Sequence, residues 1–229
     1  MIDVAPGTIA VFADLGCPWS HLAVHRLLAT RHAMGLDAEV VLDHRPFILE
    51  LANDEPTPRR TLDAEIPVLG GLDPAAGWQM WQAGDSTWPV TMLLPMEAVQ
   101  AAKEQSLRAG EQLDRALRVA FFGESRCISL RSVVLDVASR CAAVDADRLA
   151  AALDDGRARR ALVEGHRAAE AAEEVDGSPH LFLPDGTNAH NPGIEMHWEG
   201  EQGHGFPVVT KDDPSIYGDL LVQAARLAA

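Results

Sequence analysis

The sequence predicts an α/β fold in the order βαβ, helical block, ββα. Three observations lead to this prediction. An apolar segment rich in Ile, Val and Phe opens the chain, an alanine-rich stretch with helical periodicity fills its middle, and short β-like segments followed by a helical pattern close it. With 229 residues and a hydrophobic content of 47%, the chain can bury a substantial core, so we expect one domain that carries an insertion.

The opening segment predicts a βαβ unit. Residues 7–13 are rich in Ile, Val and Phe, which is typical of a strand. A helix should follow, with Cys17 near its N-cap, Pro18 in its first turn and its end around Gly35, because proline is well tolerated where a helix begins. Residues 38–43 are interpreted as a second strand. A right-handed crossover would make the two strands parallel.

The middle of the chain divides into a loop-like part and a helical part. Residues 46–95 hold several prolines and the tryptophans Trp78, Trp81 and Trp88, so we interpret them as irregular. The tryptophans either line an apolar groove near Cys17 or cover the junction between core and insertion. Residues 96–175 predict four or five helices. Breaks are expected near Gly110, Gly123, Asp145 and Gly156.

The last part of the chain regains β character. Residues 180–183 and 187–190 are interpreted as strands on either side of a Pro-Asp-Gly turn. Residues 190–198 are interpreted as a surface loop stabilised by turn chemistry, with a binding loop as the alternative. Asp213 and Pro214 should supply the N-cap and first position of a final helix.

Charge and targeting signals limit the function classes. A net charge of -15 argues against an electrostatic grip on nucleic acid or on an anionic membrane surface. The N-terminal segment does not resemble a secretory signal, and no run of about 18 apolar residues is present. The cysteines Cys17, Cys127 and Cys141 are odd in number and scattered, which is typical of reduced thiols. We therefore expect a cytoplasmic protein.

The most informative motif is Cys17-Pro18-Trp19-Ser20, which looks like a redox Cys-x-x-Cys motif whose second cysteine is serine. A thiol where a strand passes into a helix is suited to nucleophilic chemistry, because the helix N-terminus stabilises the thiolate. We expect Cys17 to attack a disulfide and the Ser20 hydroxyl to hydrogen-bond its thiolate. Pro18 and Trp19 would control access. The alternative is a buried packing cysteine.

Two histidines follow the motif on the same predicted helix. Cys17, His21 and His25 lie at spacings of four residues, near one face of the helix. A structural zinc site needs further ligands that converge tetrahedrally, so we expect no metal. His21 is instead expected to be a neighbouring donor that modulates the thiol. His25 should be a half-exposed helix residue.

The order of elements, the Cys-Pro-x-x motif after the first strand and Ser178-Pro179 before the third resemble the DsbA-like branch of the thioredoxin fold. This branch includes FrnE-type oxidoreductases, 2-hydroxychromene-2-carboxylate isomerases and kappa-class glutathione transferases. The resemblance spans nearly the whole chain. It implies a thioredoxin-like core formed by residues 1–91 and 176–229, and a helical insertion domain formed by residues 92–175.

The resemblance also implies roles around the motif. Pro179 would be cis and lie against the active-site sulfur, and the Ser178 backbone would pair with an extended substrate. Catalytic roles then fall to Cys17, Ser20 and Pro179, and substrate-binding roles to Pro18, Trp19, His21 and Ser178.

The function implied by this resemblance is a thiol:disulfide oxidoreductase that acts through one cysteine. Because Ser20 cannot resolve a mixed disulfide, an external thiol such as glutathione or mycothiol would do so. We expect no covalently bound cofactor, a small-molecule or peptide thiol or disulfide as substrate, no nucleic-acid or membrane partner, and a monomer or homodimer. One alternative is a glutathione- or mycothiol-dependent transferase or isomerase. Another is a non-catalytic binding or chaperone-like module.

Overall fold

The computed structural model describes residues 2–202 and 204–228, so the outermost residues of the two expected core segments lie outside its described part. In chain order the elements of the described residues are β1 (Thr8–Ala13), α1 (Pro18–Ala33), β2 (Val41–Pro46), α2 (Leu49–Ala52), α3 (Arg59–Leu72), the short 3-10 helices η1 (Pro74–Ala76) and η2 (Asp85–Thr87), α4 (Leu93–Lys103), α5 (Leu107–Phe122), α6 (Arg131–Ala138), α7 (Ala146–Asp155), α8 (Arg157–Ala171), β3 (His180–Phe182), β4 (Asn188–His190), β5 (Ile194–Glu199), β6 (Phe206–Asp212) and α9 (Ile216–Arg226).

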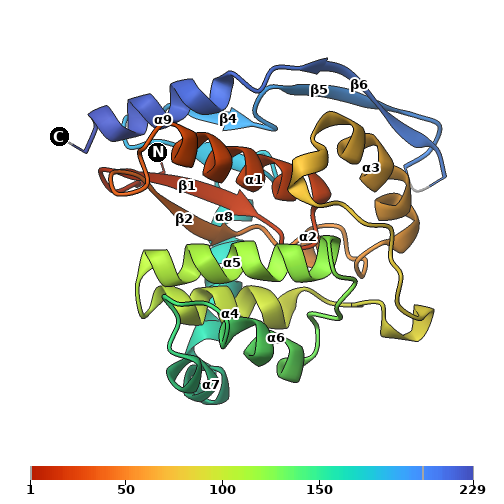
Figure 1. Ribbon diagram of the computed structural model, residues 1–229, viewed down its shortest axis with the longest axis horizontal. Helices are drawn as coiled ribbons and strands as arrows, with labels where there is room; N and C mark the ends of the chain where they lie inside the picture. Colours follow the sequence, from red (N-terminus) through yellow and green to blue (C-terminus); the bar gives the residue numbers. More distant parts are fainter. Residues whose placement is uncertain (1, 203, 229) are drawn as a thin grey trace.

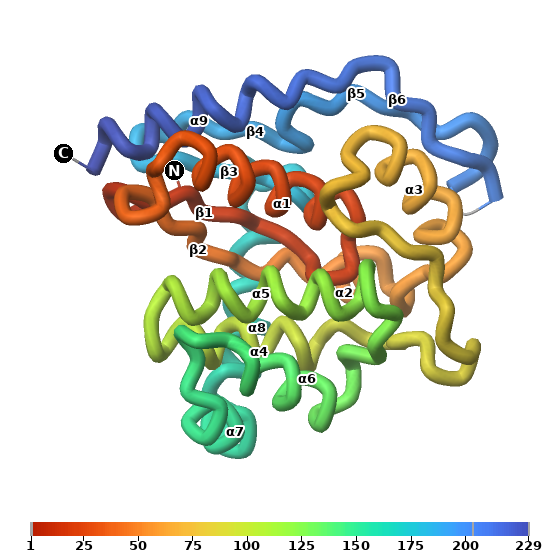
Figure 2. The backbone as a smooth tube through the Cα atoms, viewed as in Figure 1, coloured from red at the N-terminus to blue at the C-terminus, as the bar shows by residue number. Residues whose placement is uncertain are grey.

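A central sheet confirms the α/β class. Within the described chain it has four strands in the order β2-β1-β3-β4. β1 and β2 are parallel, as the predicted βαβ unit requires, whereas β3 runs antiparallel to both β1 and β4. β1 and β3 are distant in sequence, yet they lie side by side (Figure 2).

The two faces of β1 explain the layers of the molecule. Ile9 and Val11 join a core cluster with α1 and α9, while Ala10 and Phe12 join a smaller cluster with Phe182 and α8. Successive side chains of a strand point to opposite faces, so a fully apolar strand is expected where both faces are covered. Figure 1 shows α1 and α9 on one side of the sheet and α4, α5 and α8 on the other.

The first helix begins as the sequence predicts. Cys17 is its N-cap and Pro18 occupies its first turn. The helix ends at Ala33, and Gly35 follows with a positive φ of 70°, a conformation that glycine adopts without strain. Nearly every side of α1 is buried, because it packs against α9, α3 and α5 as well as the sheet.

The second strand begins later than expected. It spans Val41–Pro46, not residues 38–43. The backbone N–H groups of Glu39 and Val40 both bond to the Leu36 carbonyl, which closes a turn over the first part of the predicted strand. The apolar pattern could not show this, because the turn depends on hydrogen bonds between backbone groups.

The interpretation of residues 46–95 as irregular is wrong for α3, which spans Arg59–Leu72. Its buried residues include Leu62, Ile66 and Leu69, which lie four and three residues apart and therefore share one face. Pro67 lies inside the helix and obscured this periodicity. A proline removes only one backbone donor, and here burial of the apolar face outweighs that loss.

The helical block has the predicted number of helices among the described residues, five from α4 to α8. The expected break near Gly110 is wrong, because Gly110 lies inside α5. The chain instead turns just before Ser106, whose hydroxyl accepts a hydrogen bond from the Ala109 N–H and so caps α5. Asp145 caps α7, and Gly156 separates α7 from α8, as expected.

The C-terminal part contains an addition to the predicted order. A surface loop was expected at residues 190–198, but β5 lies there and pairs with β6 in an antiparallel two-stranded sheet of the described residues. The final helix begins at Ile216, two residues after the predicted start. Asp213 is not its N-cap; its carboxylate accepts hydrogen bonds from the N–H and hydroxyl groups of Ser215. No helix in the described ranges has the length and apolar character needed to span a membrane.

Candidate active site around Cys17

The structure places Cys17 where β1 ends and α1 begins. Its thiol is buried, with 4% of the residue exposed, and donates a hydrogen bond of 3.3 Å to the Ser178 carbonyl. The Ser178–Pro179 peptide bond is cis, and Pro179 is buried. Two segments 161 residues apart in sequence therefore meet at the sulfur atom.

Burial raises the pKa of the Cys17 thiol to about 11. Hydrogen bonds from the Ser178 side chain and the Ser20 backbone lower the pKa, and the negative charges of Glu65 and Asp14 raise it further. The expectation of a thiolate stabilised by the helix N-terminus is therefore wrong for this state of the protein. Removing the thiolate from water costs more free energy than its hydrogen bonds return.

The Ser20 hydroxyl does not serve the thiol as predicted. It is fully buried and lies 2.7 Å from the Asp14 carbonyl and 2.8 Å from the Cys17 carbonyl, to which it can donate. It also accepts a hydrogen bond of 2.7 Å from the Arg118 guanidinium. The hydroxyl therefore anchors the start of α1 to the rest of the fold. The Ser20 backbone, not its hydroxyl, contributes to the thiol.

Arg118 connects the helical block to the motif. It lies on α5, is only 1% exposed, and forms an ion pair of 2.7 Å with Asp114 one turn earlier. The same guanidinium reaches the carbonyl oxygens of Asp14 and Leu15 at 3.2 and 3.4 Å. A planar guanidinium with several fixed donors suits this bridging role. Arg118 thus holds the turn that precedes Cys17.

Asp14 shapes the same turn from the other side. Its carboxylate accepts hydrogen bonds from the N–H groups of Gly16 at 2.6 Å and Leu49 at 2.9 Å, and its own N–H donates to the Ser178 hydroxyl at 2.9 Å. Burial raises the pKa of Asp14 to about 6, although these N–H groups and Arg118 partly offset the effect.

His21 lies away from the thiol. Its Nε2 is 3.0 Å from the Ala76 carbonyl, so this nitrogen carries the proton, and its ring stacks on Phe122 and meets the edge of Trp78. Burial lowers the pKa of His21 to about 3. A neutral histidine that already donates to a carbonyl does not fit the expected role as a donor to Cys17. His25 is half-buried, near Asp73.

Trp19 positions a second acid. Its indole N–H donates a hydrogen bond of 2.7 Å to the Glu65 carboxylate, which is supplied by α3. Burial raises the pKa of Glu65 to about 7, and the bond from Trp19 offsets only part of that rise. Trp19 therefore orients an acid whose pKa lies near neutral pH.

Asp14, Cys17, Trp19, Glu65 and Ser178 line a cavity of about 570 Å³, whereas Ser20, His21 and Arg118 are not among its described lining residues. Cys17, Pro18 and Trp19 form one wall, α2 and α3 form another, and Gly177 and Ser178 close a third. The hairpin strand β5 adds Met196 and Trp198, next to His190 and Asn191, so the described structure places part of the expected surface loop at this cavity. Figure 1 shows α2, α3 and the β5–β6 hairpin gathered at the end of the sheet where β1 meets α1.

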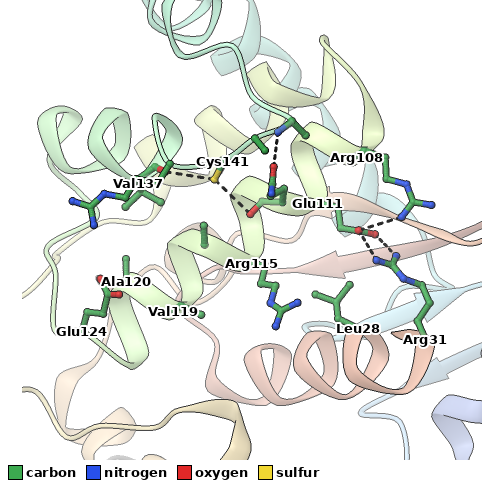
Figure 3. Close-up of a pocket in the computed structure, with 15 residues that line it drawn as sticks. Leu28, Arg31, Arg108, Glu111, Arg115, Val119, Ala120, Glu124, Val137 and Cys141 are labelled. Atoms are coloured by element: carbon green, nitrogen blue, oxygen red, sulfur yellow. Dashed lines mark hydrogen bonds and ion pairs between the residues drawn. The ribbon is translucent and has the colours of Figure 1, made fainter. Parts of the chain in front are cut away.

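The other two cysteines are free and take no part in this cavity. Cys141 is buried and its sulfur lies 3.5 Å from the Val137 carbonyl. It lines a different, larger cavity of about 800 Å³ between α1, α5 and the end of α6 (Figure 3). Cys127 is half-buried. The larger cavity lacks Cys17, so size alone does not identify the candidate site.

The tryptophan-rich segment packs into the core of the helical block. Trp81 and Trp88 contact each other and Phe121, with ring centroids 5.1 to 5.9 Å apart. Trp78 packs on Phe122. None of the three tryptophans is among the described residues that line the Cys17 cavity. They cover the junction between the sheet domain and the helices.

Sequence reasoning missed three residues of the site: Asp14, Glu65 and Arg118. Asp14 had a visible signal, a carboxylate at the end of an otherwise apolar strand. The sequence holds no such signal for Glu65 or Arg118. Each is distant from the motif and lies on a helix whose sequence pattern reveals only the apolar face. No group of three or more His, Cys, Asp or Glu residues within the described ranges has the geometry of a metal site.

Comparisons with known proteins agree with this geometry. The model of the DSBA-like thioredoxin domain family matches residues 8–202. No curated protein matches the sequence.

Solved structures share the fold at low identity. The cytosolic disulfide reductase DsbM from Pseudomonas aeruginosa is 17% identical, with 96% of this chain and 100% of that chain covered at a TM-score of 0.66. In the structure of DsbM with glutathione, the matched chain has 15% sequence identity to this one. The match covers 96% of each chain at a TM-score of 0.59. A probable DsbA oxidoreductase from Streptomyces coelicolor is 18% identical, with 95% and 89% covered and a TM-score of 0.62. A 2-hydroxychromene-2-carboxylate isomerase is also 18% identical, with 80% and 87% covered and a TM-score of 0.57.

Proposed function

Since this chain belongs to the DSBA-like thioredoxin domain family, we propose that it is a thiol:disulfide oxidoreductase that works through one nucleophilic cysteine, Cys17. The observation that carries this proposal is the position of the Cys17 sulfur. It lines a cavity of about 570 Å³ and bonds to the carbonyl of Ser178, directly before the cis Pro179. Cys17 is the one cysteine among the described residues that line this cavity, so a substrate sulfur that enters it meets the Cys17 thiol.

The reaction begins with loss of the Cys17 proton. Because its pKa is about 11, the thiol is almost fully protonated at neutral pH and needs an acceptor. The Glu65 carboxylate lines the same cavity and has a pKa near 7, so it is suited to take that proton. Trp19 keeps this carboxylate in place.

The thiolate then attacks one sulfur of the substrate disulfide. A bond forms between Cys17 and that sulfur as the substrate's own sulfur–sulfur bond breaks, and the leaving thiolate takes up a proton. Ser20 cannot attack the mixed disulfide. An external thiol therefore attacks it, joins its sulfur to the substrate fragment and returns Cys17 as a thiol. The Ser178 backbone and Pro179 would dock the substrate beside the sulfur.

The resolving partner is a low-molecular-weight thiol in this proposal. Support comes from Ser20, whose hydroxyl is occupied by Arg118, and from Cys127 and Cys141, which are free and lie outside the Cys17 cavity. The fold neighbour DsbM was solved with glutathione, which supports a small thiol as partner in general.

The test is formation and release of a mixed disulfide. The reduced protein is treated with bis(2-hydroxyethyl) disulfide, and the adduct is located by peptide mass spectrometry. We expect one adduct on Cys17, released by added 2-mercaptoethanol. Cys17→Ser should form none, while the matched control Cys141→Ser should react as the unaltered protein does. Equal modification of Cys17→Ser and Cys141→Ser would contradict the proposal.

A second candidate is a transferase or isomerase that uses a bound external thiol. One observation favours it: Cys17 is protonated and donates to the Ser178 carbonyl, so it could orient a cofactor thiol without reacting itself. Turnover that requires an added thiol and survives in Cys17→Ala would identify this candidate. If the protein showed neither disulfide exchange nor thiol-dependent turnover, a binding or chaperone-like module would be the remaining candidate function.

A further inference from the structure

The cavity around Cys17 carries charge of one sign. Its carboxylates are Asp14, Glu50, Glu55, Glu65 and Asp176. None of the described residues that line it is lysine or arginine. This distribution bears on which thiols and disulfides can approach the sulfur.

The lack of cations is specific to this cavity. The larger cavity beside α5 is lined by Arg31, Arg108, Arg115 and Arg140, with Glu111 and Glu124 as its acids. Figure 3 shows Arg115 reaching from α5 toward α1, where Leu28 lies. Arginines can therefore line a cavity even in a protein with a net negative charge. The described residues that line the Cys17 cavity include no lysine or arginine, although the chain has 19 of them.

The carboxylates at the inner part of the cavity are held by uncharged donors. Glu65 accepts from the Trp19 indole, and Glu50 accepts from the Thr91 hydroxyl and the Met92 N–H, each at 2.7 Å. Such donors position a carboxylate without adding positive charge, and Glu65, whose pKa is about 7, is ionised in part at neutral pH. Asp14 does lie near Arg118, but that guanidinium is paired with Asp114 behind the cavity.

The rim of the cavity adds two more acids. Glu55 and Asp176 are exposed and lie on opposite segments, one after α2 and one before the cis Pro179. Asp176 lies 3.8 Å from a ring nitrogen of His180, which is a histidine and not a lysine or arginine. A substrate that enters the cavity therefore passes between negative groups, where field lines of one sign are focused.

The remaining lining suits an uncharged polar ligand. Asn53, Thr57, Thr61, Asn191 and Gln202 offer amide and hydroxyl groups. Phe47, Met196 and Trp198 offer apolar surface. Amides and hydroxyls can both donate and accept, so they match hydroxyl-rich or amide-rich molecules without a charge partner.

We propose that this cavity selects thiols and disulfides that are uncharged or positively charged near the sulfur, and disfavours those that carry carboxylates, such as glutathione. The inference rests on the proposed function and specifies its substrate class. Of the two resolving thiols expected from the sequence, mycothiol carries no carboxylate and matches the charge of this cavity, whereas glutathione carries carboxylates and does not match it.

The test compares three disulfides of different charge. The reduced protein reacts with cystamine, which is cationic, with bis(2-hydroxyethyl) disulfide, which is neutral, and with glutathione disulfide, which is anionic. Each rate constant for Cys17 is divided by the rate constant of the same disulfide with the uncharged model thiol N-acetylcysteine amide, which removes differences in leaving-group reactivity. At low ionic strength we expect normalised rates to fall in that order, with glutathione disulfide slower than cystamine by about tenfold or more, equal to about 1.4 kcal/mol. Added salt should narrow the range.

Variants of the rim carboxylates test whether these residues cause the charge selection. Glu55→Gln/Asp176→Asn should raise the normalised glutathione disulfide rate relative to that of cystamine, and Glu55→Lys should raise it further. The matched control is Glu39→Gln/Asp219→Asn, which removes two exposed carboxylates elsewhere. Glu39 precedes β2 at the opposite end of the parallel pair from Cys17, and Asp219 lies on α9. This control should leave the order of rates unchanged.

The outcomes separate the two proposals. Equal normalised rates for the three disulfides, or equal effects of the cavity variant and the control variant, would overturn charge selection while leaving exchange at Cys17 intact. No reaction of Cys17 with any of the three would overturn the proposed function, and the charge selection with it.

Discussion

The Arg118 guanidinium donates a hydrogen bond of 2.7 Å to the Ser20 hydroxyl, across 98 residues of sequence. One partner belongs to a helix of the helical block and the other to the motif around Cys17. The fourth position of that motif is therefore a structural contact between the two parts of the molecule. This relationship gives the Ser20 hydroxyl a structural role that needs no hydrogen bond to the thiol.

The Ser20→Ala substitution tests that relationship. It removes an acceptor from a buried guanidinium, so we expect the free energy of unfolding to fall by about 1–3 kcal/mol. Because the hydroxyl is hydrogen-bonded to Arg118 and to backbone carbonyls and not to the sulfur, the pH dependence of Cys17 alkylation should stay the same. Ser139→Ala is the control, since its hydroxyl bonds to the Asp136 carbonyl at an exposed site. Its effect should stay within about 0.5 kcal/mol. A shifted alkylation profile in Ser20→Ala would restore the role first expected for this hydroxyl.

The protonation state of Cys17 gives a second prediction. Its pKa of about 11 lies above the usual value, so the thiolate fraction rises about tenfold per pH unit throughout the neutral range. In a Cys127→Ser/Cys141→Ser background, the rate of alkylation by the neutral reagent iodoacetamide should therefore keep increasing from pH 6 to about pH 9.5. A rate that levels off below about pH 8 would show that the thiolate is stabilised after all.

Glu65→Gln gives a third prediction, on stability. Burial raises the pKa of Glu65 from 4.5 to about 7, so between these values the folded state binds a proton that the unfolded state has lost. Stability due to this group therefore decreases as the pH rises through that window, by at most about 3 kcal/mol. The glutamine side chain still offers the Trp19 N–H an acceptor oxygen, but it does not titrate between these pH values.

We therefore expect the melting temperature of Glu65→Gln, relative to that of the unaltered protein, to be higher at pH 8 than at pH 5. Glu39→Gln, an exposed glutamate variant, should show the same difference at both pH values. If Glu65→Gln behaves as Glu39→Gln does, Glu65 is ionised normally and is not suited to exchange a proton with Cys17.

A fourth prediction concerns Ser20→Cys. Residues three apart at a helix start have neighbouring side chains, and their Cα separation falls within the span of a disulfide. Mild oxidation should therefore remove two titratable thiols from this variant, one of them Cys17, and added dithiothreitol should return both. In the control Ser139→Cys the introduced thiol is at the exposed end of α6, and Cys17 should remain titratable. Retention of all thiols in Ser20→Cys would mean that Arg118 holds this position away from the sulfur.

Local patterns were enough to predict much of the fold. The apolar run of β1, the proline after Cys17 and the alanine-rich periodicity of α4 to α8 each depend on residues close together in sequence, and the structure confirms all three. Two other predictions of the fold were wrong, each for its own reason. Pro67 concealed α3, and the pairing that makes β5 and β6 a hairpin depends on contacts that turn residues alone do not reveal.

By itself, the sequence determined that a thiol would stand at a strand-to-helix junction, because N-cap and proline preferences act within one helical turn. Only the tertiary structure decided what surrounds that thiol. Glu65, Arg118 and Ser178 reach the motif from 46, 98 and 161 residues away. Burial and charge act through space, so the high pKa of Cys17, the anchoring of Ser20 and the acidic cavity arise from segments that no local pattern connects.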